Sequence, residues 1–414
     1  MKTSTQRRTC RLCDSTKLDL AVPIKASPVA DAYVPADRLR EEQELYPLDL
    51  YLCADCGHVQ LLEVVDPGIL FGNYIYTTSI SLGLVEHFRG YADQILARFT
   101  FRQNSLAVDI GSNDGTLLKF FQARGLRVAG IDPAVEIAKR ATADGVPTIP
   151  AFFDLALARR LRRENGAAAI VTANNVFAHS DNLPEMAEGI RELLADDGVF
   201  VFEVSYLADI LQKKLFDTVY HEHLCYHSVK PLAVFFARHG LEFIDVERLP
   251  NKGGSLRGLV QRQGGPRRIM PVVEALQREE ESLGLMKLDV FKNFSADLQR
   301  VKNELLQLLR QLKSDGQKIA GFGASATVTT LVYHFELGPF LSFLVDDNVS
   351  RHGLFSPGHH LPVFPAAALR GQNAGQAIVL AWQYAGPILK KHQDFTAQGG
   401  RFILPLPEVR IIDH

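Results

Sequence analysis

Between residues 104 and about 262, apolar segments with strand character alternate with amphipathic helical segments. The first strand, SLAVDIGSND, runs into a glycine-containing turn, and the helical pattern GTLLKFFQARG follows it. This alternation is typical of a doubly wound α/β sheet. The last two segments, LEFIDVERL and GSLRGLVQRQG, read as consecutive strands joined by a glycine-rich turn, which a purely parallel sheet would not need.

The rest of the chain divides around this region. Residues 270–314 are charged and apolar at helical spacing, which predicts a long helix or a helical pair. The last hundred residues begin again with strand, helix and strand in QKIAGFGASA, TVTTLVYHF and LSFLVDDN, so a second, smaller α/β unit is expected. Since 414 residues exceed what one core usually supports, we predict an α/β protein of three parts, with boundaries at 1–70, 71–270 and 271–414.

Four of the five cysteines form two CxxC pairs, Cys10/Cys13 and Cys53/Cys56. Two such turns can complete a tetrahedral zinc site, in which the metal replaces a core too small to fold alone. A shell of four sulfurs leaves no open position, so the expected zinc is structural. Four buried free cysteines are the alternative. A redox role is less favoured, because the chain has two CxxC pairs rather than a single one. About 40 residues separate the pairs, so the insert must fold as an excursion.

Charge and hydropathy argue against several classes of binding partner. The formal net charge of -2 provides no basic field for nucleic acid or anionic lipid, and no apolar stretch approaches the length of a membrane span. We therefore expect a cytoplasmic enzyme with a small or mid-sized substrate, without nucleic-acid or membrane partners, as a monomer or homodimer.

The segment VDIGSNDG places Gly111 and Gly115 around a tight turn between strand and helix, and Asp132 ends the next strand. An acidic side chain there can accept hydrogen bonds from ribose hydroxyls. A dinucleotide site would need GxGxxG, whereas this loop carries Asp114, which favours a cofactor without phosphates such as S-adenosylmethionine (SAM). An ordinary turn with a capping aspartate is the simpler alternative. The predicted cofactor-binding residues are Asp109, Gly111, Asn113, Asp114, Asp132, Phe153 and Asn174.

The run FDTVYHEHLCYH follows an apolar strand and helix, and within eight positions it holds six tyrosine, histidine and glutamate side chains: Tyr220, His221, Glu222, His223, Tyr226 and His227. Such a cluster at the edge of a sheet indicates proton transfer. A metal site is less favoured, because the HExxH spacing is absent, and structural hydrogen bonding accounts for at least half of the six. His179, in TANNVFAH, is placed at the mouth of the same cleft or at the surface. The GFGASA turn offers backbone N–H groups that could bind a phosphate, although a lone GxG is a weak signal.

Taken in order, these motifs resemble the SAM-dependent sugar C-methyltransferases that act on nucleotide-linked 4-keto-hexoses in branched deoxysugar biosynthesis. The resemblance covers nearly the whole chain and also includes GGSLR at 253–257 and PGHHLPV near 357. It implies an N-terminal zinc-binding module, a central SAM-methyltransferase Rossmann-like domain and a C-terminal Rossmann-like domain that helps to bind the nucleotide sugar. The chain departs from the family pattern at GASATVTT and at Asn251-Lys252, which leaves the nucleotide and the sugar substituents open.

The resemblance also implies catalytic roles. His223 is expected to be the general base, with Tyr220 and Glu222 beside it, while Tyr76 and His179 close around the sugar. The base would remove the proton of carbon 3, which the 4-ketone acidifies, and the resulting carbon nucleophile would take the methyl group of SAM. Methylation at carbon 5, a nicotinamide-dependent nucleotide-sugar oxidoreductase and a zinc-ribbon binding protein without catalysis are the alternatives.

Overall fold

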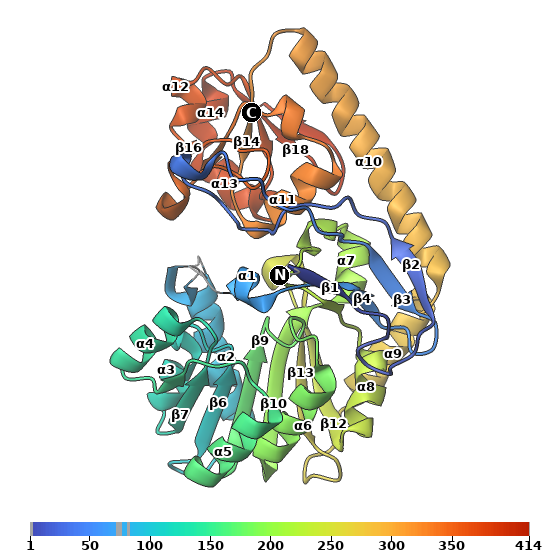
Figure 1. Cartoon of the computed structure of the whole chain (residues 1–414), viewed down its shortest axis with the longest axis vertical. Coiled ribbons are helices and arrows are strands. Elements are labelled where there is room, and N and C mark those ends of the chain that lie inside the picture. The colour runs from blue at the N-terminus through green and yellow to red at the C-terminus, as the bar shows by residue number, and fades with distance from the viewer. Residues whose placement is uncertain (1–2, 72–76, 81–82, 414) are drawn as a thin grey trace.

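The computed structural model describes residues 3–71, 77–80 and 83–413, and its strands form four sheets. The largest sheet lies in the lower half of Figure 1 and the C-terminal sheet in the upper half. The N-terminal sheet lies beside the junction of the two, and the long helix α10 runs along one flank. This arrangement agrees with the predicted α/β class.

The central sheet has the strand order β12-β13-β10-β9-β6-β7-β8. The strands β10, β9, β6, β7 and β8 are parallel, whereas β13 is antiparallel to both β10 and β12. The two consecutive final strands expected from the sequence are β12 and β13. The bounds are β6 (Leu106–Ile110), β7 (Arg127–Ile131), β8 (Thr148–Ile149), β9 (Ala168–Asn174), β10 (Leu194–Ser205), β12 (Leu241–Leu249) and β13 (Ser255–Arg262). The chain order reverses between β6 and β9, so a ligand crevice is expected beyond their carboxyl ends.

Helices cover both faces of this sheet. Successive residues of β6 alternate between two hydrophobic clusters: Ala107 packs with α2 and α3, whereas Leu106 and Val108 pack with α5, α6 and α8. This alternation follows from the two-residue period of a strand. The helices of the central region are α2 (Leu84–Arg98), α3 (Thr116–Gln122), α4 (Val135–Ala143), α5 (Leu155–Asn165), α6 (Leu183–Leu193), α7 (Leu207–Lys213) and α8 (Val229–Arg238).

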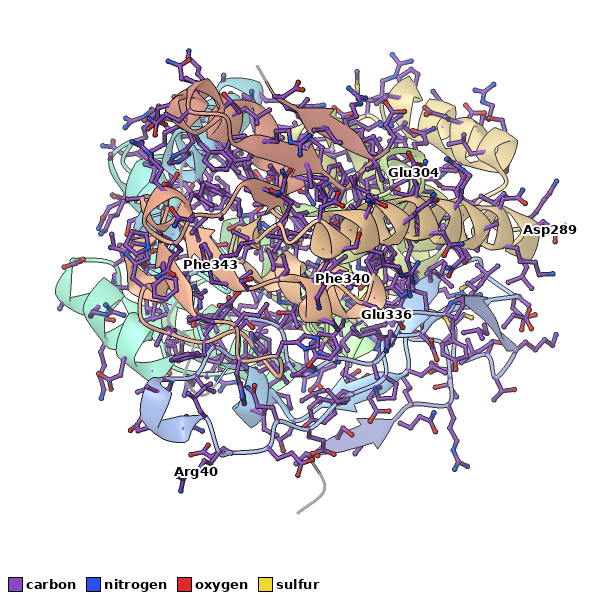
Figure 2. All side chains as sticks on the ribbon, turned by 90° about the horizontal axis from the view of Figure 1, so that it is seen from above. Arg40, Asp289, Glu304, Glu336, Phe340 and Phe343 are labelled. Carbon is purple, nitrogen blue, oxygen red and sulfur yellow. The ribbon has the colours of Figure 1, made fainter. Side chains whose placement is uncertain are left out.

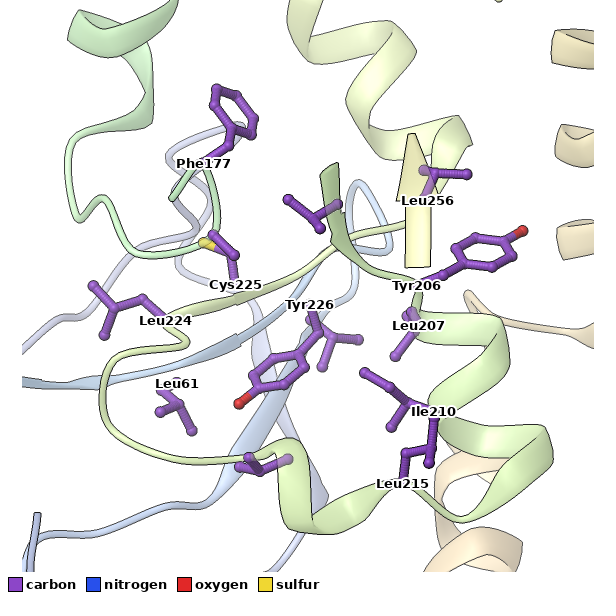
Figure 3. Packing of buried hydrophobic residues seen from close by; sticks show 14 of the residues in the cluster. Leu61, Phe177, Tyr206, Leu207, Ile210, Leu215, Leu224, Cys225, Tyr226 and Leu256 are labelled. Atoms are coloured by element: carbon purple, nitrogen blue, oxygen red, sulfur yellow. The ribbon is translucent and has the colours of Figure 1, made fainter. Parts of the chain in front are cut away.

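The N-terminal sheet includes a strand from the central region. Its order is β11-β4-β3-β2, and β11 (Cys225–Tyr226) pairs antiparallel with β4 through Cys225 opposite Gln60. Figure 3 shows Leu61 beside Leu224 and Tyr226 in the core that these segments share. The remaining N-terminal elements are β1 (Ser4–Gln6), β2 (Leu18–Val22), β3 (Leu50–Cys53), β4 (Val59–Leu61), β5 (Glu63–Val65) and α1 (Pro67–Phe71).

The insert between the two CxxC pairs folds as an excursion, as predicted, and it reaches the C-terminal region. The backbones of Val34 and Phe355 exchange two hydrogen bonds of 3.0 and 2.8 Å. The Arg351 guanidinium donates to both carboxylate oxygens of Asp31 at 2.6 Å. We refer to residues 24–49 as the strap, because this segment ties the N-terminal sheet to the C-terminal sheet.

The predicted helical pair consists of α9 (Pro271–Leu283) and α10 (Leu288–Ser314). Apolar side chains of α10 recur at intervals of three or four residues from Phe291 to Leu312 and are buried. Its 27 residues span about 40 Å. Figure 2 looks onto this helix, with the turn that carries Phe340 beside it. The helix therefore connects the central and C-terminal regions along one continuous apolar face.

The C-terminal sheet has the order β16-β15-β14-β17-β18-β19, with β14 parallel to both of its neighbours. The predicted strand, helix and strand correspond to β14, α11 and β15. The elements are β14 (Ile319–Phe322), α11 (Ala326–His334), β15 (Phe343–Asp346), β16 (Val363–Pro365), α12 (Ala368–Gly371), β17 (Gln376–Val379), α13 (Ala385–Lys391), α14 (Gln393–Ala397), β18 (Arg401–Leu404) and β19 (Arg410–Ile412). Among the helices of the described residues, none has the length and apolar character needed to cross a bilayer.

Candidate active site

A cavity of about 820 Å³ lies between the central sheet and the C-terminal sheet. Its walls come from the carboxyl ends of β6, β7 and β9, from the segment 217–223, from the turn at 251–252 and from loops of the C-terminal sheet. The strap contributes Asp31. All three parts of the chain therefore meet at one site that is large enough for two ligands.

The glycine turn after β6 forms one end of the cavity. Gly111 has a φ of 72°, which a residue with a side chain adopts only with strain. Asp132, at the end of β7, accepts hydrogen bonds from the backbone N–H of Asn113 and of Ala134, both at 2.9 Å. This carboxylate therefore fixes the turn and the start of α4 while lining the cavity.

Six of the seven predicted cofactor-binding residues line this end: Asp109, Gly111, Asn113, Asp132, Phe153 and Asn174. Asp109 accepts a hydrogen bond from the Thr172 hydroxyl at 2.6 Å, and burial raises the pKa of its carboxyl to about 7. The donors and acceptors here are carboxylates, amides and backbone groups, without a lysine or arginine. That set suits the ribose and adenine of SAM, which carries no phosphate.

Asp114 is not among the residues that line the cavity. Its carboxylate accepts hydrogen bonds from the backbone N–H of Ser79 at 2.9 Å and from the Thr116 hydroxyl at 2.6 Å. It thus connects the segment before α2 to the first turn of α3, as in the capping alternative considered from the sequence.

We expect Gly111→Ala to weaken SAM binding and to lower the free energy of unfolding by about 1–3 kcal/mol. A Cβ at this position would lie 2.2 Å from Cγ2 of Val176, which also lines the cavity. Gly90→Ala is the matched control, because a Cβ at this helical position meets no atom within 4 Å and alanine favours a helix. Calorimetric SAM titration and urea unfolding measure both effects. Unchanged affinity in Gly111→Ala would contradict the placement of SAM at this turn.

His223 lies on the cavity wall with a defined tautomer. Its Nδ1 donates a hydrogen bond to the backbone carbonyl of Thr218 at 2.8 Å, so the lone pair of the ring is on Nε2. Burial lowers the pKa of this imidazole to about 4, which keeps the ring neutral near pH 7. A neutral imidazole with a free Nε2 lone pair can accept a proton.

The other predicted catalytic residues surround this ring. The Tyr220 ring centroid lies 4.0 Å from that of His223, and the His179 ring stacks on His223 at 5.1 Å. Burial lowers the pKa of His179 well below its usual value. Burial also raises the pKa of Glu222 to about 8, and the nearby Asp31 carboxylate adds to this. The structure brings these four residues together in the cavity, whereas Tyr76 lies outside the described residues.

The C-terminal region holds the segment that carries His223. The Trp382 Nε1–H donates to the Asp217 carboxylate at 2.9 Å, and the Thr330 hydroxyl donates to the Val219 carbonyl at 2.6 Å. Burial raises the pKa of Asp217, which also lines the cavity, to about 7. The position of the imidazole therefore depends on side chains more than one hundred residues further along the chain.

Sequence reasoning missed a buried charge network next to the cavity. Glu203 on β10 accepts hydrogen bonds from Arg257 Nε at 2.7 Å, and a ring nitrogen of His87 lies 2.7 Å from its other carboxylate oxygen. The Arg257 guanidinium also lies over the Tyr91 ring, 4.4 Å from its centroid. A glutamate inside the apolar strand GVFVFEVSY was the available signal, because a buried carboxylate needs a partner.

The four cysteines of the two CxxC pairs form a second site, at the end of β3 beside the N-terminal sheet. All four Sγ atoms lie within 4.8 Å of one another, with Cys10 to Cys56 at 3.5 Å and Cys13 to Cys53 at 3.6 Å. Ideal tetrahedral zinc with Zn–S bonds of about 2.3 Å separates its sulfurs by about 3.8 Å. The cluster therefore fits zinc as the structural metal that the spacing predicted.

Known proteins match all three parts of the chain. Residues 10–71 match the model of a zinc binding domain, residues 84–246 a methyltransferase domain and residues 250–407 a C-methyltransferase C-terminal domain. The C-methyltransferase NovU of Streptomyces niveus is 32% identical over 404 residues, which cover 97% of this chain and 96% of that protein. The chain belongs to the C-methyltransferase family. It is a SAM-dependent C-methyltransferase with a zinc-binding module, and this assignment decides against the oxidoreductase and the non-catalytic binding protein.

Solved methyltransferase structures match the chain over less than half of its length. They include magnesium protoporphyrin IX methyltransferase from Synechocystis PCC 6803 with bound SAM, which is 12% identical, covers 44% of this chain and 81% of that chain, and has a TM-score of 0.33. They also include the CcbJ methyltransferase from Streptomyces caelestis, which is 13% identical, covers 48% of this chain and 96% of that chain, and has a TM-score of 0.34. Scores this low add nothing to the family assignment.

Proposed function

We propose that this C-methyltransferase acts on carbon 3 of a nucleotide-linked 4-keto-hexose. The observation that carries the proposal is that a neutral His223, with its lone pair on Nε2, lines the same cavity as the glycine turn that would hold SAM. A sugar carbon next to a ketone has an acidic C–H, which an imidazole can deprotonate.

Each residue around the cavity has a separate role in the proposed reaction. Nε2 of His223 removes the proton, and the Thr218 carbonyl keeps the ring oriented through Nδ1. Tyr220 or His179 donates a hydrogen bond to the oxygen on which negative charge develops. SAM supplies an electrophilic methyl group. The cavity walls hold the two reactants in contact, which lowers the entropic cost of bringing them together.

The C-terminal side of the cavity supports a nucleotide sugar. Ser325 and Thr327 line it at the start of α11, where backbone N–H groups can bind a diphosphate. Asp346, at the end of β15, accepts a hydrogen bond from the Ala324 N–H at 2.6 Å. Asp132 accepts a hydrogen bond from the Asn113 N–H of the glycine turn in the same manner. The central and C-terminal sheets therefore present similar strand-to-helix turns to the cavity.

The test is methyl transfer from labelled SAM to a panel of TDP- and GDP-linked 4-keto-6-deoxyhexoses. We expect a gain of one methylene mass in at least one sugar, with NMR placing the new carbon–carbon bond at carbon 3. The matching sugars reduced to a 4-hydroxyl are the controls and should stay unmodified. Methylation of a hydroxyl oxygen, or of no keto-sugar in the panel, would refute the proposal, while a new bond at carbon 5 would refute the assigned carbon.

The pH profile gives a further prediction. Since burial lowers the pKa of His223 to about 4, the imidazole should stay unprotonated as the pH falls from 7.5 to 5.5. We therefore expect kcat, measured at saturating SAM and sugar, to show no acidic limb near the ordinary histidine pKa of about 6.5. A limb at that value that is absent from the residual rate of a His223 variant would contradict the neutral-base assignment.

A further inference from the structure

Lys252 occupies a strained position at the edge of the cavity. It lies in the turn at Asn251–Gly253, between β12 and β13, with φ 52° and ψ 33°. A residue with a side chain in this left-handed conformation costs roughly 1–2 kcal/mol. The turn is held by a hydrogen bond of 3.1 Å from the Gly254 N–H to the Asn251 carbonyl and by one of 2.8 Å from Lys213 Nζ to the Gly253 carbonyl. The surroundings therefore fix the lysine where glycine would be easier to place.

Lys252 also provides an unpaired positive charge on the cavity wall. Among the described residues that line the cavity, the lysines and arginines are Lys252 and Arg351. Arg351 donates to both carboxylate oxygens of Asp31, so its charge is balanced. The Lys252 side chain is exposed to the cavity, and within residues 3–71, 77–80 and 83–413 its ammonium forms no ion pair and no side-chain hydrogen bond.

This charge acts on the residues around the base. Burial lowers the pKa of His223, and the Thr218 carbonyl opposes that shift while the Lys252 charge adds to it. After burial and His223, Lys252 also lowers the pKa of His179. Burial between the cavity walls takes water from the Lys252 ammonium and lowers its pKa, while the charges of Glu203 and Glu222 oppose this shift and favour the ammonium form. The lysine is therefore part of the same electrostatic cluster as His223.

We propose that Lys252 is a catalytic residue whose ammonium meets the negative charge on the substrate oxygen as His223 removes the neighbouring proton. The inference rests on the proposed function. The C–H electron pair becomes the carbon–carbon double bond, the carbonyl π pair moves to oxygen, and the proton goes to Nε2 of His223. The carbon–carbon double-bond pair then forms the new bond to the methyl group of SAM while the pair on oxygen re-forms the ketone. The S–CH3 pair stays on sulfur, which leaves as S-adenosylhomocysteine. Lys252 compensates the charge between these two events, and the neutral donors Tyr220 or His179 add a hydrogen bond.

The experiment separates proton removal from methyl transfer. The enzyme is incubated in D2O with a TDP- or GDP-linked 4-keto-6-deoxyhexose and S-adenosylhomocysteine, and deuterium entering next to the ketone is followed by NMR. We expect Lys252→Met to lower this exchange rate, and kcat with SAM, by about 10²–10³-fold, as for loss of one oxyanion donor. SAM affinity should stay within twofold of wild type, and Lys252→Arg should retain more exchange than Lys252→Met.

Two further variants serve as controls. Lys252→Gly removes the ammonium and relieves the backbone strain, so it should fold at least as well as wild type and still lose exchange. Lys292→Met removes an exposed charge from α10, where Lys292 faces Asp289 outside the cavity, and should exchange at the wild-type rate.

Exchange at the wild-type rate in both Lys252→Met and Lys252→Gly would overturn the inference. So would a rise in KM with kcat unchanged, which would show that Lys252 only binds substrate. If wild-type enzyme methylates the sugar but these variants exchange normally, the inference alone fails. If wild-type enzyme neither exchanges nor methylates any keto-sugar, the proposed function fails and the inference falls with it.

Discussion

Replacing His223 with asparagine is expected to lower kcat by about 10²–10⁴-fold while leaving SAM affinity within twofold of wild type. Asparagine can keep a hydrogen bond to the Thr218 carbonyl, which His223 Nδ1 reaches at 2.8 Å, but it has no lone pair of comparable basicity. Steady-state kinetics and calorimetric SAM titration measure the two quantities. The glycine turn that would hold SAM is hydrogen-bonded to Thr78, Ile131 and Asp132, so the loss in kcat should occur without a loss of SAM affinity.

His239→Asn is the matched control, because His239 follows α8 beside Glu188 and does not line the cavity. It should retain the wild-type kcat. The decisive readout is deuterium exchange next to the ketone, which should disappear in His223→Asn and persist in His239→Asn. Rapid exchange in His223→Asn would move the base elsewhere in the cavity, with Glu222 as the next candidate because its carboxyl lies in the same cluster.

The parts of the fold that local pattern determines were predictable. The strand at Leu106–Ile110 is wholly apolar apart from Asp109, and the glycines at 111 and 115 mark the turn that follows. The two CxxC pairs predicted a four-sulfur cluster from spacing alone. The pairing of Cys225–Tyr226 with β4 was not predictable, because a two-residue strand leaves no periodic signal and its partner lies some 165 residues away.

The candidate site likewise has features that the sequence predicted and features that it could not predict. The cluster around His223 could be predicted because several titratable side chains are adjacent in sequence. The partners that position it could not, since the bonds from Trp382 to Asp217 and from Thr330 to the Val219 carbonyl join segments that only the folded chain brings together. Asp114 stays a predicted cofactor residue from its place in the glycine turn, while the structure directs its carboxylate to the Thr116 hydroxyl and to the Ser79 N–H, 35 residues away in sequence.

Removal of zinc, by a strong chelator or by Cys53→Ser, is expected to unfold the N-terminal module and abolish turnover. Structural zinc sites contribute apparent binding free energies of about 10–16 kcal/mol, which matches or exceeds the whole stability of a typical domain at about 5–15 kcal/mol. The N-terminal module contacts two parts of the cavity wall on the side expected to bind substrate: the segment that carries His223, and Arg351. The Leu61 N–H donates to the Leu224 carbonyl at 2.9 Å beside the His223 segment, and the strap holds Asp31 against Arg351 at the cavity.

The SAM-binding end should survive, because the glycine turn and Asp132 belong to the central sheet and are fixed by bonds within it. Zinc-depleted protein should therefore bind SAM but neither exchange nor methylate a keto-sugar, and limited proteolysis should cut first within residues 10–71. Cys225→Ser is the control, because Cys225 lies outside the four-sulfur cluster and its loss should leave zinc content at one per chain. Full turnover by metal-free Cys53→Ser protein would show that the cluster does not organise the site, and loss of SAM binding would show that its influence reaches the central sheet.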